Sequence, residues 1–182
     1  ILILTFQTPS QADDIRDFQI EGMSIGDSAL DFFNRNAIEA EKKISINDQF
    51  GYKDKEFFRA VFSEKQLKNN GKFKIYDYLQ LHIKTNDKNY ILHSIEGKII
   101  FKNNIKDCYV QKDKIIEEIK SIFPNMKIKN DKSAHKADAT GKSLTDSTYF
   151  YLNNNTGNVG VACYDWSIEA GLSDNLKVFV DT

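Results

Sequence analysis

The sequence predicts an α+β fold in which helices pack on one face of an antiparallel sheet. Helical stretches are each followed by several short strands, and hairpin turn signals such as 153–157 join neighbouring strands. This order occurs twice along the chain. We therefore expect one helix-then-meander half over residues 13–104 and a second over 105–182, either as tandem halves or as one continuous domain.

The first half carries alternating apolar residues and strong turn signals. The segment Glu56–Ser63 is rich in aromatic and β-branched residues, as strands are. Asn69-Asn70-Gly71 predicts a turn, and Gly97 a bend or a bulge within a return strand. The elements expected, in order, are a strand at 15–20, helical pieces at 28–34 and 36–43, and strands at 56–63, 73–84 and 90–101.

The second half opens with the clearest helix of the chain. It is predicted from Cys108 to Phe123, with Asp107 as its N-cap and Pro124 as its stop. A polar loop is expected at 130–147. The strands expected around this loop and after it are 126–129, 148–152, 159–167 and 175–181.

The two cysteines, Cys108 and Cys163, are predicted to form a disulfide. Cys108 shares an apolar helical stripe with Ile115 and Ile119, and Cys163 alternates with Val161 on one face of a strand. Both thiols therefore point inward, as a bridge from helix to sheet requires. The alternative is a pair of unbonded buried cysteines that act as small apolar residues.

The first twelve residues, ILILTFQTPSQA, are typical of the end of a secretory signal peptide. An apolar run is followed by Ser10 and Ala12, small residues two positions apart that suit signal peptidase cleavage. The alternative is a buried strand over Ile1–Phe6. We expect a signal-peptide remnant at 1–12 and a periplasmic or secreted protein.

The charge balance excludes some classes of partner. Lys and Arg number 25 against 26 Asp and Glu, for a net charge of −1. Nucleic acid binding needs a surplus of cations, so no nucleic acid partner is expected. No transmembrane segment is expected after residue 12, since no apolar run approaches the ~20 residues that span a bilayer. No cofactor motif is found either.

One loop contains the best candidate ligand-binding residues. Lys132, His135, Asp138 and Lys142 lie close together in the sequence, and Gly141 can expose backbone amides to an anion. A small hydrolase or anion-binding protein would use His135 as base and Lys142 to hold the anion. The ending T-G-K-S lacks the first glycine of a phosphate-binding loop. The alternative is a solvated loop.

Other clusters favour structural roles over catalytic ones. His82 and His93 could bind Zn²⁺ together with Asp77 or Glu96, but half-exposed sheet residues are the commoner case, and no metal site is predicted. The aromatic residues near the end of the chain are expected to pack in the core, Trp166 under a helix, with a ligand-binding platform as the alternative. These residues are Tyr149, Tyr151, Tyr164 and Trp166.

Three strings carry a family resemblance. DFQIEGMSIGDSAL (17–30), HKADATGKS (135–143) and ACYDWS (162–167), with DNLKV near the end, resemble an uncharacterised family of small exported proteins of marine alphaproteobacteria. The IGDS turn is also similar to the opening of outer-membrane assembly lipoproteins and β-lactamase-inhibitor-like domains. That likeness implies helix pairs placed before antiparallel strands, whereas the uncharacterised family implies no active site.

Taken together, these observations predict an exported, non-enzymatic binding module. A protein or a cell-envelope component is the expected partner. The small hydrolase or anion-binding protein that uses the 132–143 loop remains the alternative.

Overall fold

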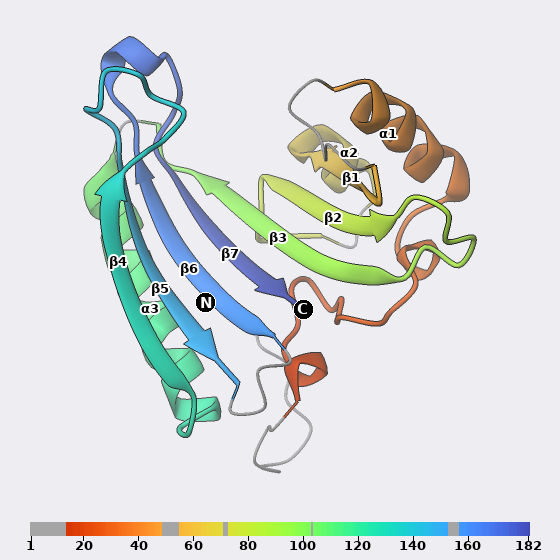
Figure 1. The fold of residues 1–182 in the computed structure, drawn as a ribbon, viewed down its shortest axis with the longest axis horizontal. Coiled ribbons are helices and arrows are strands. Elements are labelled where there is room, and N and C mark those ends of the chain that lie inside the picture. The colour runs from red at the N-terminus through yellow and green to blue at the C-terminus, as the bar shows by residue number, and fades with distance from the viewer. Residues whose placement is uncertain (1–13, 49–54, 71–72, 103, 153–156) are drawn as a thin grey trace.

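A computed structural model describes residues 14–48, 55–70, 73–102, 104–152 and 157–182. The predicted leader at 1–12 lies outside these residues. Seven antiparallel strands form one sheet in the order β1-β2-β3-β7-β6-β5-β4 (Figure 1). The α+β class is confirmed. The strands are β1 Phe57–Ser63, β2 Tyr78–Lys84, β3 Leu92–Ile100, β4 Lys127–Ala134, β5 Leu144–Tyr151, β6 Asn158–Asp165 and β7 Asn175–Asp181.

The C-terminal strand β7 lies in the middle of the sheet, between β3 and β6. It therefore links strands from both predicted halves across the boundary near residue 104. The three α-helices are α1 Arg35–Asn47, α2 Glu64–Asn70 and α3 Ile105–Ile122, and single 3-10 turns occur at Ile15–Asp17, Ala29–Asp31 and Ile168–Ala170. Among the described helices, none has the length and apolar character needed to cross a bilayer.

Alternating residues divide the sheet into two faces. One face carries Ala60, Leu81, Ile95, Val180 and Val159, which lie in register across five strands and are fully buried. We call this the helix face, because α3 is bonded to it. The residues between them, such as Phe179 and Tyr164, are half-buried and form the open face. This alternation is expected of a sheet that buries one side more completely than the other.

Helix α3 is fixed to the helix face by the predicted disulfide. Cys108 and Cys163 are bonded, with their Cα atoms 6.0 Å apart, so this prediction is confirmed. One turn further along, the buried Lys112 forms an ion pair with Asp146 of β5. The predicted cap was wrong. Asn104 occupies the N-cap position. Asp107 lies within the first turn, where its negative charge interacts favourably with the positive end of the helix dipole.

Helix α1 runs along the free edge of β1 and satisfies its backbone. The amide of Arg59 donates to the Ser45 hydroxyl at 2.8 Å, and the amide of Val61 donates to the Glu41 carboxylate at 3.4 Å. Gln66 of α2 accepts from the amide of Ser63 at 2.8 Å. Three alternate amides of this edge strand are thereby capped, so β1 has little capacity to pair with another strand.

Two predictions in the first half were wrong for local reasons. Residues 15–20 form a 3-10 turn and a bridge from Ile20 to Met23 instead of a strand, because Asp14 and Asp17 cap that turn reciprocally. Gly97 makes no bulge. Its missing side chain leaves room for the ring of Tyr76, which lies 2.5 Å from where a Cβ would be.

The remaining differences concern the ends of elements. The register shift in this hairpin lies at His82/Ile83 of β2. Residues 64–70 form α2 where only a turn at Asn69-Asn70-Gly71 was predicted, and residues 71–72 are outside the described part. The predicted polar loop 130–147 is largely strand, because β4 and β5 pair from Lys127↔Tyr151 to Ala134↔Leu144. The true loop is 135–143.

Candidate binding site

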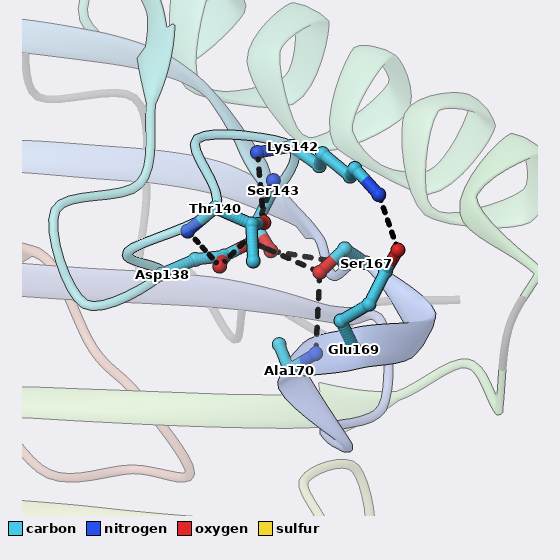
Figure 2. Close-up of polar contacts among 7 residues, drawn as sticks. All are labelled: Asp138, Thr140, Lys142, Ser143, Ser167, Glu169 and Ala170. Atoms are coloured by element: carbon cyan, nitrogen blue, oxygen red, sulfur yellow. Dashed lines mark hydrogen bonds and ion pairs between the residues drawn. The ribbon is translucent and has the colours of Figure 1, made fainter.

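The loop 135–143 joins β4 to β5 and lies beside the connection from β6 to β7. Asp138 holds the two segments together (Figure 2). One carboxylate oxygen accepts from the amide and hydroxyl of Thr140 at 2.9 and 2.7 Å. The other accepts from the amide and hydroxyl of Ser143 at 3.0 and 2.6 Å and from the hydroxyl of Ser167 at 2.9 Å.

The hydrogen bonds to Asp138 fix its charge state. Donation by the Ser143 and Thr140 hydroxyls is the largest cause that holds the pKa of this carboxyl far below its usual range. Ser167 in turn accepts from the amide of Ala170 at 3.2 Å, and its own amide donates to Ser143 at 2.9 Å. Asp138 is therefore a buried, ionised acceptor that orders two loops.

Lys142 points away from Asp138. Its ammonium group forms an ion pair with Glu169 on the 3-10 turn after β6 (Figure 2). Ile168, beside Glu169, is 96% exposed, and Leu172 is 54% exposed. The tip of this connection thus presents two apolar side chains next to a solvent-exposed ion pair.

His135 lies against aromatic rings. Its ring centre is 4.3 Å from that of Trp166 and 5.4 Å from that of Tyr164. The Nδ1 atom accepts from the amide of Ala137 at 3.1 Å, and burial lowers the pKa of the imidazole. Both effects favour a neutral ring with Nδ1 as an acceptor, which leaves Nε2 as the protonated nitrogen.

Lys132 lies on the other face of the sheet. Its ammonium is 3.8 Å from Asp146, the carboxylate that also pairs with Lys112, and 5.8 Å from the ring centre of Tyr109 on α3. The structure therefore brings His135 and Asp138 into one loop but directs Lys132 and Lys142 to different carboxylates. The four predicted residues do not converge on a common point.

The aromatic residues gather on the open face of β5, β6 and β7. Phe179 lies directly over Gly160, where a Cβ would be 2.0 Å from the ring, so only glycine allows this ring to lie flat. Tyr149 meets Phe179 edge to face with ring centres 5.9 Å apart, and Tyr151 stacks on Tyr149 at 6.3 Å. Each of the three rings is half-buried.

Tyr164 and Trp166 extend these rings towards the loop 135–143. The two rings stack at 6.2 Å, so Trp166 lies on the face opposite α3, and the prediction that it packs under a helix was wrong. We call this set of rings the aromatic platform. It consists of Tyr149, Tyr151, Tyr164, Trp166, Phe179 and His135.

Charged and polar residues border the platform on the side of β3 and β2. Lys177 pairs with Glu96 at 3.0 Å and lies 4.9 Å from the ring centre of Tyr164, a cation–π distance. Further across, His82 contacts Gln80 at 2.7 Å. Burial and the charge of Arg59 lower the pKa of His82 to about 4, so it is neutral at physiological pH.

Metal-binding geometry does not occur among the described residues, where no three His, Cys, Asp or Glu side chains group together. Glu96 is paired with Lys177, and Asp77 accepts from the amide of Ile100 at 2.7 Å.

Comparison with protein-family models, curated proteins and solved structures finds no match to this chain. The geometry of the open face is therefore the main guide to function.

One sequence signal could have predicted the aromatic platform, namely the alternation of aromatic residues along the strands. Tyr149 and Tyr151 alternate in one strand, as do Tyr164 and Trp166 around β6, and each pair shares a face. Phe179 alternates with Val178 and Val180, which the sequence assigns to the core, so it had to face the other way. The pattern showed that the rings share a side, but not that α3 covers the opposite side.

Proposed function

We propose that this protein is an exported, non-enzymatic binding module whose aromatic platform contacts a protein or a cell-envelope component. The observation that carries the proposal is the placement of six half-buried rings on the face opposite α3. Such rings present large, rigid contact areas that lose little conformational entropy on binding.

The border of the platform supplies direction to the binding. Glu96 and Lys177 offer one acceptor and one donor group beside Tyr164. A few polar groups around an apolar surface fix the orientation of a ligand, while the apolar part supplies most of the affinity. The expected ligand therefore has flat apolar groups with hydrogen-bonding edges, as aromatic or proline side chains and sugar rings do.

Two features support export. The segment 1–12 has the pattern of a signal-peptide end. The Cys108–Cys163 disulfide favours an oxidising compartment, since such bonds are rare in the cytosol. A periplasmic or secreted location agrees with both.

Trp166 provides a direct test, because it is the single tryptophan of the chain and belongs to the platform. Ligand binding should shift its fluorescence emission and protect it from a soluble quencher. Peptides rich in aromatic residues and proline, and fragments of cell-envelope glycan, are the two sets of probes. Tyr149→Ala should weaken binding at least several-fold, whereas Val110→Ala on the outer surface of α3 should not change it.

Catalysis is the outcome that would overturn the proposal. The alternative hydrolase would need His135 as its base, yet this ring accepts from Ala137 and packs on Trp166. Turnover of any substrate that His135→Gln abolishes, without a change in melting temperature, would replace the binding module by that enzyme.

A further inference from the structure

Within the described part of the chain, no other segment pairs with or caps the outer edge of strand β4. All eight of its side chains are exposed, from Lys127 to Ala134, and β5 is its neighbour on one side only. The opposite edge is different, since β1 has the amides of Arg59, Val61 and Ser63 capped by side chains of α1 and α2. An uncapped strand of this length is a template for pairing with another strand.

The charges on β4 select one kind of pairing. Lys129 and Asp131 both lie on the open face, in register with Tyr149 and Ser147 of β5. Asp131 accepts from the hydroxyl of Ser133 at 3.0 Å, and within the described part of the chain Lys129 forms no ion pair. The open face of β4 thus exposes Lys129 and Asp131 two positions apart, with Lys127 before them, while Lys132 lies on the helix face beside Asp146.

Two copies of β4 can pair antiparallel about a twofold axis in few registers. Residues that pair directly must lie on the same face of the joined sheet. The axis therefore lies between one residue and the same residue of the second copy, and the register is centred on that residue. The two registers with the most overlap centre on Asn130 or on Asp131. The first places Lys129 opposite Asp131 of the second copy, twice; the second places the two Asp131 carboxylates opposite each other.

Like charges directly opposite each other destabilise a strand pair, and opposite charges stabilise it. We propose that a second copy of this chain pairs with β4 in the register centred on Asn130, which joins the two sheets into one. The twofold axis is perpendicular to the sheet, so both open faces lie on the same side. The two aromatic platforms then flank the seam, each one strand away from it through Tyr149.

Charge-swap variants test this register in the full chain. Light scattering during size-exclusion chromatography should give twice the mass of one chain for the wild type. Lys129→Asp and Asp131→Lys should each give the mass of a single chain, because each places two like charges opposite each other. The double variant Lys129→Asp/Asp131→Lys restores the pairing and should again give twice the mass.

A control variant and two further measurements test whether the loss of the dimer comes from the charges on β4. Lys88→Asp, the same charge change in the exposed turn between β2 and β3, should leave the dimer intact. Equal melting temperatures of the two single variants would show that both remain folded. Amide hydrogen exchange should slow within β4 of the dimeric forms only.

Three results would overturn the proposal: a wild type that stays monomeric at every concentration, a dimer that the single variants leave unchanged, or a double variant that stays monomeric. A monomer whose β4 amides become protected by another polypeptide would also overturn it, in favour of a different partner. Self-pairing does not depend on what the platform binds. Monomeric variants that keep the Trp166 response would therefore leave the binding function in place.

Discussion

The two ends of the sheet use their helices in different ways. At one end α1 lies beside β1, and its side chains, such as Ser45, accept hydrogen bonds from the edge amides of β1. At the other end α3 lies across β6 and β7 and is held there by the Cys108–Cys163 disulfide (Figure 1). Helix α1 therefore protects an edge, whereas α3 protects a face, and no described residue caps the β4 edge.

This difference separates two kinds of stabilisation. The end that contains α3 depends on one covalent link and a partly buried ion pair, Lys112 with Asp146. The end that contains α1 depends on polar caps and on stacked rings, such as Phe33 on Phe62 with centres 3.8 Å apart. Substitutions at the two ends should accordingly differ in size.

The largest effect is expected from removal of the disulfide. Cys108→Ser/Cys163→Ser should lower the free energy of unfolding by about 4 kcal/mol, since the bond closes a loop with a sequence separation of 55 in the unfolded chain. Urea denaturation of the oxidised wild type and the variant measures the difference. Reductant should produce the same loss in the wild type and none in the variant. An unchanged midpoint in the variant would contradict the role assigned to the bond.

A smaller effect is expected at the loop that Asp138 orders. Asp138→Asn places an amide N–H₂ group among hydroxyl donors, so the melting temperature at pH 7 should fall, by less than in the disulfide variant. The folded pKa lies below the unfolded value of about 3.9, so the carboxylate stabilises above about pH 4 and loses this effect as pH falls through the folded pKa.

The difference in melting temperature between the Asp138→Asn variant and the wild type should therefore shrink as pH falls from about 4 to about 2. Asp113→Asn, an exposed site on α3, serves as control and should follow the wild type at every pH. A difference that stays constant from pH 7 to pH 2 would show that the charge of Asp138 is not what stabilises the loop.

The smallest effect is expected at the β1 edge. Ser45→Ala removes the acceptor of the Arg59 amide and should cost about 1 kcal/mol, the typical net value of one hydrogen bond. Hydrogen exchange should quicken at the Arg59 amide in particular. Ser121→Ala on α3, whose hydroxyl only donates to the Glu118 carbonyl of its own helix, is the matched control. Equal exchange at Arg59 in both variants would argue against edge capping.

The sequence predicted those parts of the fold whose signals are local. The apolar stripe that contains Cys108 and the alternation around Cys163 were sufficient to predict the disulfide, since each pattern fixes the direction of one side chain. The strand 175–181 was placed at its observed bounds for the same reason. The class of fold follows from such patterns.

Features that depend on distant partners were not predictable. β4 is polar at six of its eight positions and shows no apolar alternation, so the sequence predicted a strand only at 126–129 and its pairing with β5 reveals the rest. Asp138 was selected as a ligand-binding residue because polar loops often carry function, yet its partner Ser167 lies 29 positions away. No local pattern could indicate that this carboxylate is already satisfied by the chain itself.

The capped edge of β1 limits how far any assembly through strand addition can grow. A sheet with two bare edges can add chains at both ends without end, which is the geometry of a fibre. Here one edge is closed by Ser45, Glu41 and Gln66, so a chain that has joined another through β4 has no second edge to offer. Assembly through β4 therefore stops at two chains, because α1 and α2 block the addition of a further strand at β1.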